Sequence, residues 1–340
     1  MKATKMPSGN WRVRVEVGTD ADGKRIWKSF SGASKKQVVA RAAAFAAEHQ
    51  ATRGALTLEK ASEKYISHRE KTLSPATIRG YNKILRRFKK DYPKFMRENI
   101  SLITADDVQD VIDDMAGTDS PKTVHNYISF VSAVLRHNRI AMPMVEKPRR
   151  KGPEIVPPTE ESVRRTLAAA KEKSEELWIC LALAALGPLR QGEIAALSIE
   201  DVDFERRTVH VRHSMVYSDA HEWIVKEPKT YESDRIILMP GEVIEAIGRQ
   251  GYITKMNPDA LRFAFYRLLR ANGIPRYRFH DLRHYCISML HAKGYPDRYI
   301  ENRSGHATDC VMRRVYTHTI EAERMRIEKN MLEDLSGVLG

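Results

Sequence analysis

The sequence predicts a multidomain protein of the α+β class, mainly α-helical with small β-sheets. Three observations support this. The chain has 340 residues, more than one domain usually holds. Its hydrophobic pattern changes along the chain from the alternation of strands to the 3.6-residue period of helices. A basic segment with five prolines, "AMPMVEKPRRKGPEIVPPT", then separates a helical stretch from a mixed one.

The first part, residues 1–56, reads as a small sheet followed by a helix. "WRVRVEV" at residues 11–17 alternates apolar and charged side chains, as a half-exposed strand does. A D-G turn and "IWKSF" complete a hairpin. The alanine-rich residues 34–50 begin at a Ser N-cap and predict a helix. So few residues make only a small core, and one or both tryptophans are expected in it.

Residues 57–140 predict a small bundle of four helices, and residues 141–158 a semi-extended linker. Two of the helices begin with Ser-Pro, at Ser74 and Ser120, which places proline in the first turn. A third begins at Thr104 with acidic residues in its first turn, which suits the helix dipole. The linker could pass around a rod-like ligand.

The mixed part, residues 159–325, alternates helices and short strands, and a tail, residues 326–340, follows. "EELWICLALAAL" is apolar on all sides and predicts a buried helix. The strands are expected in "RTVHVRHSMVY", "EWIVKE" and "DRIILMP". Helices are expected near residues 258–272 and 280–293, with a short one near 296–303.

Composition favours a nucleic-acid partner over a membrane. The formal net charge is +13, and residues 1–56 carry 11 Lys and Arg against 4 Asp and Glu. No apolar run reaches the ~18 residues of a membrane helix. The N-terminus has no secretory signal, and the three cysteines lie far apart, so a cytoplasmic setting is expected.

Some basic residues are candidate DNA contacts, although a charged face is often only solvated. The basic residues on the front strands and their turn are interleaved with aromatic side chains, as in two-stranded β-ribbons that read a DNA groove. The others lie on the second helix of the bundle and in the linker. The candidates are Arg12, Arg14, Lys24, Lys28, Arg79, Lys83, Arg86, Arg87, Arg149 and Arg150.

Six residues of the mixed part, each near the end of an element, suggest chemistry on a phosphodiester. They are Arg190, Lys229, His280, Arg283, His306 and Tyr316. Arginine forks bind two phosphate oxygens, histidines add directed hydrogen bonds, lysine can protonate an alkoxide, and tyrosine can attack phosphorus. The sequence has no paired carboxylates, phosphate loop or metal-ligand cluster, so no metal or other cofactor is expected.

The order of these six residues resembles the tyrosine recombinase (phage integrase) family over residues 159–325. Residues 57–140 resemble its core-binding domain. The front segment resembles the arm-type DNA-binding domain of integrases from phages and conjugative transposons. The resemblance implies a site-specific recombinase that integrates or excises such an element, acting on double-stranded DNA attachment sites as a homotetramer.

The resemblance also implies a role for each residue. Arg190 and Arg283 would bind the scissile phosphate, with His280 and His306 hydrogen-bonded to it. Lys229 would be the general acid, and Tyr316 the nucleophile that forms a 3′-phosphotyrosine. Strand exchange would pass through a Holliday junction, with residues 326–340 contacting a neighbouring subunit. Host or element-encoded DNA-bending or excision factors could assist.

Several alternatives stay open at this point. Lys226 rivals Lys229, and Tyr285 and Tyr299 are other tyrosines nearby. Gly187-Pro188 replaces the usual Thr-Gly before Arg190, and Ser304 stands at a usually apolar position. A resolvase of chromosome or plasmid dimers is a second enzyme hypothesis. A DNA-binding regulator without cleavage is a third hypothesis, against which the complete set of six residues argues.

Overall fold

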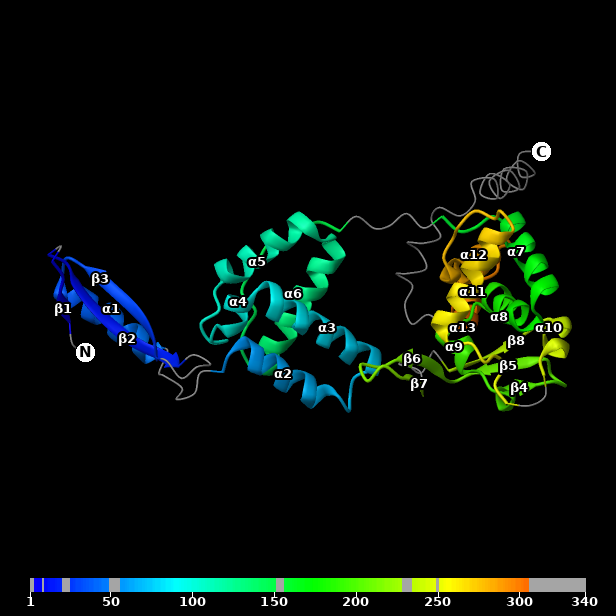
Figure 1. The fold of residues 1–340 in the computed structure, drawn as a ribbon, viewed down its shortest axis with the longest axis horizontal. Helices are drawn as coiled ribbons and strands as arrows, with labels where there is room; N and C mark the ends of the chain where they lie inside the picture. Colours follow the sequence, from blue (N-terminus) through cyan, green and yellow to red (C-terminus); the bar gives the residue numbers. More distant parts are fainter. Residues whose placement is uncertain are drawn as a thin grey trace, which may run out of the picture. The chain divides into compact units, whose positions relative to one another are not determined.

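The chain is predominantly helical with small antiparallel sheets, which confirms the predicted α+β class (Figure 1). It divides into two compact units, Met1–Lys151 and Gly152–Gly340. Four candidate site residues, Lys24, Lys229, His306 and Tyr316, lie outside the described residues, as does the tail 326–340. The computed structural model describes residues 3–7, 9–19, 25–48, 56–150, 156–227, 234–248 and 251–305.

The front of the chain forms a three-stranded antiparallel sheet with a helix packed on one face. The sheet order is β1-β2-β3, and α1 follows. Val13 and Val15 of β2 are buried against Val38 and Ala42 of α1. The elements are β1 (Thr4–Lys5), β2 (Trp11–Thr19), β3 (Arg25–Gly32) and α1 (Lys35–Glu48).

The register of this sheet separates the basic residues that the sequence grouped together. Arg12 and Arg14 alternate with the buried valines, so they lie on the open face. Trp27 pairs with Glu16, belongs to that same face and is 47% exposed. Lys28 pairs with Val15 on the helix side, where its Nζ lies 4.7 Å from the ring centroid of Phe45. The expected tryptophan of the core is Trp11, which packs against the valine cluster.

A bundle of five helices follows, one more than predicted. The extra helix is the short α4, which begins at Pro93 directly after α3 ends. Thr104 forms a capping box with Asp107, and Ser120 accepts a hydrogen bond from the backbone of Thr123. The helices are α2 (Leu58–Arg69), α3 (Pro75–Asp91), α4 (Pro93–Arg97), α5 (Ala105–Thr118) and α6 (Pro121–His137).

The first half of the linker lies along this bundle. The side chain of Gln109 accepts a hydrogen bond from the backbone N–H of Glu146 at 2.9 Å and donates to its carbonyl at 3.3 Å. His125 Nε2 lies 3.0 Å from the carbonyl oxygen of Pro148. Met142 and Val145 pack against the apolar core of the bundle. Residues 141–148 are therefore held in an extended path along the bundle.

The second unit packs helices around the buried helix α8 and contains two small sheets. The sheet orders are β4-β5-β8 and β6-β7, all antiparallel. The helices are α7 (Glu160–Lys173), α8 (Glu175–Leu186), α9 (Gln191–Ala196), α10 (Gly241–Ala246), α11 (Pro258–Ala271), α12 (Phe279–Ala292) and α13 (Asp297–Ser304), with a 3₁₀ turn η1 (Ile199–Asp201). The strands are β4 (Val202–Asp203), β5 (Thr208–Val211), β6 (Ser214–Tyr217), β7 (Trp223–Lys226) and β8 (Arg235–Leu238).

The expected single strand in "RTVHVRHSMVY" is wrong, because β5 and β6 belong to different sheets. Strand β5 pairs with β4 and β8, whereas β6 pairs only with β7 among the described strands. Helix α9 packs on β6 so closely that a Cβ on Gly192 would lie 2.7 Å from the carbonyl oxygen of Met215. This contact between distant segments leaves no trace in the local pattern.

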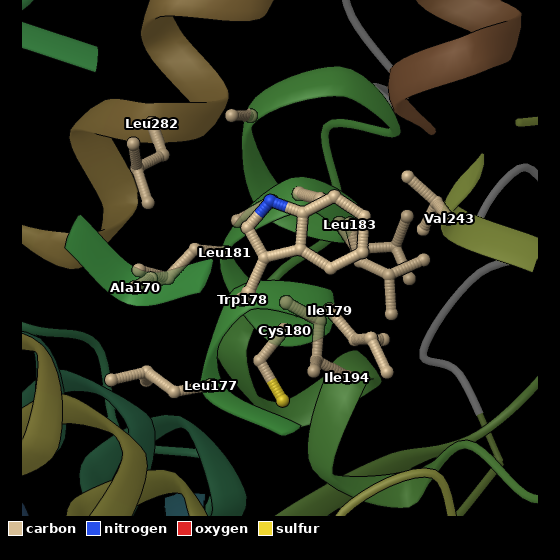
Figure 2. Close-up of a cluster of buried hydrophobic side chains, with 14 of the residues drawn as sticks. Ala170, Leu177, Trp178, Ile179, Cys180, Leu181, Leu183, Ile194, Val243 and Leu282 are labelled. Atoms are coloured by element: carbon tan, nitrogen blue, oxygen red, sulfur yellow. The ribbon is translucent and has the colours of Figure 1, made fainter. Parts of the chain in front are cut away.

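Helix α8 is buried on every side, as its composition predicted. All residues from Leu177 to Ala185 are buried. Figure 2 shows its side chains together with Val243 of α10 and Leu282 of α12. None of the described helices is long and apolar enough to cross a membrane.

Replacing Leu181 with alanine is expected to destabilise the second unit by about 2–5 kcal/mol, because it leaves a cavity in a close-packed core. Leu181 is fully buried. Urea denaturation would measure the change in the free energy of unfolding. Ile236→Ala is the control, since Ile236 is 66% exposed, and its change should stay within about 0.5 kcal/mol. Equal shifts for the two variants would contradict this account of the core.

Candidate active site

The N-terminal part of α12 carries His280 on the surface and Arg283 in the interior. The helix begins after Arg278, whose backbone N–H and side chain both bond the carboxylate of Asp281. This capping box fixes the first turn of the helix. His280 is exposed, whereas Arg283, one turn further, is only 1% exposed. Their spacing of three residues places them on one side of the helix.

Arg283 reaches the turn that follows α8. Its Nη1 donates a hydrogen bond to the carbonyl oxygen of Pro188. The turn is tight, since a Cβ on Gly187 would lie 2.9 Å from the carbonyl oxygen of Leu183 and collide with neighbouring side chains. Pro188 therefore supplies an acceptor for the arginine, and the candidate site residue Arg190 follows this Gly-Pro turn.

Arg190 stands at the N-terminus of α9 and is held at three points. Its backbone N–H donates to Glu193 Oε2 at 2.8 Å, and its Nη1 to Glu193 Oε1 at 2.7 Å. Its Nη2 donates to the carbonyl oxygen of Gly305 at 3.0 Å. The side chain of Arg190 is 36% exposed. It is thus a fixed cation with access to solvent.

The charges around His280 show that the two arginines lie near it. Desolvation, followed by the electrostatic effects of His284, Arg283 and Arg190, lowers the pKa of His280 to about 4. The imidazole is therefore neutral at pH 7. The structure therefore brings Arg190, His280 and Arg283 together from α9 and α12. A neutral imidazole near two arginines can donate or accept a proton at a phosphate.

His284 is a neighbour that the sequence did not single out. Its ring is 6% exposed and stands edge-on to His280, with centroids 4.7 Å apart and an interplanar angle of 89°. Burial, opposed by Asp281 and reinforced by nearby arginines, lowers the pKa of His284. The four-residue spacing from His280 was the available signal. The other missed residue is Glu193, whose signal was its three-residue spacing from Arg190.

Acidification is expected to destabilise the second unit through His280. Its pKa is near 4 in the folded chain against an ordinary 6.5, so the unfolded chain binds the proton first as pH falls. The stability linked to the neutral His280 imidazole is fully present above about pH 6.5 and is lost progressively as the pH falls towards 4. The melting temperature of His280→Gln should therefore fall less between pH 7 and pH 5 than that of the unchanged protein.

The control for this titration is His221→Gln, since His221 lies exposed on the β6–β7 turn. That variant should keep the full acid sensitivity. His284 and His291 have lowered pKa values too, chiefly from burial, so part of the sensitivity remains in His280→Gln. An unchanged pH slope in His280→Gln would contradict the assignment.

The remaining predicted site residues have mixed surroundings. Lys226 ends β7 and is half-buried, while Lys229 lies outside the described residues, so the choice between them stays open.

Arg87 donates to Asp119 and Asp91, and these carboxylates compete with any phosphate for it. The exposed candidates on the bundle and linker are Arg79, Lys83, Arg86, Arg149 and Arg150. Within the described ranges, no three His, Cys, Asp or Glu residues gather where they could hold a metal ion.

Residues 159–323 match the model of the phage integrase family. This part of the chain belongs to that family. The match begins at the N-cap of α7 and spans all the described helices and strands of the second unit, including Arg190, His280 and Arg283. The integrase is thus a tyrosine-type site-specific recombinase, an enzyme that breaks and rejoins DNA strands.

Relatives and solved structures extend the similarity to the first unit of this integrase. A XerC-like tyrosine recombinase of Caldanaerobacter subterraneus is 22% identical over 92% of this chain and 93% of its own. The Tn1549 transposon integrase, solved with transposon right end DNA, has a TM-score of 0.66 at 18% identity, covering 82% of this chain and 100% of its own. A lambda integrase tetramer bound to a Holliday junction has a TM-score of 0.55 at 15% identity, covering 90% and 92%. At these identities the two structures establish the fold.

Proposed function

We propose that this integrase cleaves and rejoins duplex DNA at specific attachment sites through a 3′-phosphotyrosine on Tyr316. The convergence of Arg190, His280 and Arg283 carries the proposal. Two guanidinium groups held by hydrogen bonds lie near a neutral imidazole, and this trio suits a phosphate whose charge grows during attack. Lys229, His306 and Tyr316 complete the set on sequence grounds.

The chemistry follows from these groups. The Tyr316 oxygen attacks phosphorus, the bond from phosphorus to the 5′-oxygen breaks, and Lys229 gives that oxygen a proton. The phenol has an ordinary pKa of ~10, so it must lose its proton to a nearby base as it attacks. His280, neutral at pH 7, and His306 are the candidates for that transfer. Arg190 and Arg283 stabilise the charge on the non-bridging oxygens.

The covalent intermediate makes rejoining possible without a nucleotide cofactor. The phosphotyrosine retains the energy of the broken bond, so a 5′-hydroxyl from another duplex can reverse the attack. Exchange of one strand pair would form a Holliday junction within a homotetramer, with the tail 326–340 of each subunit contacting a neighbour. This would integrate or excise a phage or other mobile element. DNA-bending or excision factors from the host or element would be further partners.

Each part of the chain has a place in this proposal. Residues 1–56 would bind arm-type sites, residues 57–140 the core site, and residues 159–325 would carry out the chemistry, joined by the linker 141–158. The open face of the front sheet, with Arg12, Arg14 and the exposed Trp27, supports the first assignment. Cations interleaved with an aromatic side chain suit a nucleic-acid surface.

A nicked duplex that traps the cleaved strand tests the proposal. Incubation with the cognate core site should give a protein–DNA adduct that survives a denaturing gel. A DNA-binding regulator of the same fold would bind the site and give no adduct. Absence of adduct on a verified cognate site would therefore exclude the recombinase mechanism for this chain.

Deleting residues 1–56 is expected to abolish integration that depends on distant arm sites while core-site cleavage stays measurable. The front sheet has its own core, in which Val13, Val15, Val38 and Ala42 pack together, so its loss should leave the second unit folded. Adduct yield on the core site and integration of an arm-bearing plasmid would be compared. Loss of core cleavage as well would contradict the arm-binding assignment, and so would full integration without the segment.

A further inference from the structure

A buried carboxylate joins Arg190 to a second arginine that cannot reach DNA. Glu193 is 5% exposed and Arg235 is 7% exposed. Arg235 Nη2 donates to Glu193 Oε2 at 2.8 Å, while Arg190 bonds both oxygens of the same carboxylate. Residues 190 and 193 belong to the start of α9, whereas Arg235 opens β8. The contact therefore crosses 42 residues of sequence.

The charge of Glu193 depends on Arg235. Burial by itself raises the pKa of the Glu193 carboxyl, but the charge and hydrogen bonds of Arg235, and then those of Arg190, reverse the effect and lower it. A buried charge is costly unless it is paired and hydrogen-bonded. With Arg235 in place, Glu193 stays ionised and its two oxygens keep a fixed orientation towards Arg190.

The two arginines also hold the end of α13. Arg235 Nε donates to the carbonyl oxygen of Arg303 at 3.0 Å, and Arg190 Nη2 donates to that of Gly305 at 3.0 Å. Gly305 ends the helix in the left-handed conformation, at φ 65° and ψ 48°. Three elements, α9, β8 and α13, are thus joined around one carboxylate.

We propose that Arg235 is a positioning residue for DNA cleavage: acting through Glu193 and the Arg303 carbonyl, it aims the Arg190 guanidinium at the scissile phosphate. The inference rests on the proposed function of Arg190. Arg235 itself is too buried to contact DNA, so its effect is on the chemical step and not on binding. Displacing a reacting group by about 1 Å can cost ~100-fold in rate.

Single-turnover cleavage of the nicked core site tests this with Arg235→Met and Arg235→Lys. The matched controls are Arg212→Met and Arg212→Lys. Arg212 Nε donates to Asp201 Oδ1 at 2.6 Å, and the side chain of Asp201 is 2% exposed. That pair is another arginine on a buried carboxylate in the same unit, without a described contact to Arg190. DNA affinity and melting temperature are measured for all four variants.

The expected result is a rate of adduct formation about 10–100-fold lower in Arg235→Met. Its DNA affinity should remain within about threefold, and both Arg212 variants should cleave within about twofold of the unchanged protein. Arg235→Lys should recover part of the rate, because an ammonium keeps Glu193 ionised without a guanidinium's full set of bonds. A purely structural role would show the same loss in the Arg212 variants and no partial rescue by lysine.

Three outcomes overturn the proposal: wild-type cleavage in Arg235→Met, an equal loss in Arg212→Met, or a loss confined to DNA affinity. If Arg235→Met does not fold, Arg235→Lys decides, and cleavage at the wild-type rate in that variant overturns the proposal. Failure of the proposed function is distinguishable, because the unchanged protein would then give no adduct.

Discussion

Replacing Tyr316 with phenylalanine is expected to reduce the covalent protein–DNA adduct on a nicked suicide substrate to background. The substitution removes only the phenolic oxygen, which is the atom that would bond to phosphorus. Removing a catalytic nucleophile leaves only the contributions of binding and charge stabilisation. DNA affinity, measured by gel shift on the same duplex, should stay close to that of the unchanged protein. The adduct on a denaturing gel is the decisive readout.

The matched controls are Tyr299→Phe and Tyr285→Phe, which remove the same atom from the rival tyrosines. Tyr299 is 71% exposed on α13, and Tyr285 packs against the core of the second unit. Burial, reinforced by Glu160, raises the pKa of Tyr285, which makes it a poorer nucleophile. Both controls should form the adduct. An adduct that survives in Tyr316→Phe and disappears in Tyr299→Phe would move the nucleophile to Tyr299.

Replacing Arg283 with lysine is expected to slow single-turnover cleavage by about 100–1,000-fold, the effect of losing one aimed donor to a developing oxyanion. The charge remains, but a lysine ammonium cannot use one nitrogen for the Pro188 carbonyl and present another to a phosphate as the guanidinium fork does. Arg283 is 1% exposed, so its position is set by packing and not by solvent. DNA affinity should change much less than the cleavage rate.

Arg278→Lys is the control, since Arg278 is the N-cap of the same helix and its side chain is 59% exposed. In the lysine variant the backbone N–H of residue 278 still caps α12 through Asp281, and the side-chain charge is kept. The Arg278 variant should cleave within a fewfold of the unchanged protein. Wild-type cleavage in Arg283→Lys, with melting temperature unchanged, would remove Arg283 from the catalytic set.

The candidate site could be assembled from the sequence because its members are chemically distinctive. Arg190, His280 and Arg283 stand at helix starts that caps and turns mark, and their order along the chain identified the set. The residues that orient them carried no such mark. Glu193 looked like one of many helix glutamates, and Arg235 like an ordinary charge before a strand. Their roles arise from a contact between α9 and β8 that no local pattern encodes.

Local patterns also could not decide which charged residues are available to a ligand. Arg87 belongs to the same cationic helix as Arg79 and Lys83, yet it is tied to Asp119, 32 residues away. Lys28 belongs to the same basic strand pair as Arg14, yet the register turns it towards Phe45 of α1. Pairing with distant elements settled each case.

The sequence by itself determined the α+β class, the buried α8, the capped helices of the bundle and the family that residues 159–323 match. These depend on apolar period, caps and the order of rare side chains, all of which are local or chemical. Only the tertiary structure decided that Arg283 is buried while His280 is exposed, and that Glu193 joins Arg190 to Arg235. The reason is physical: burial and pairing of charges are set by contacts between segments far apart in the chain.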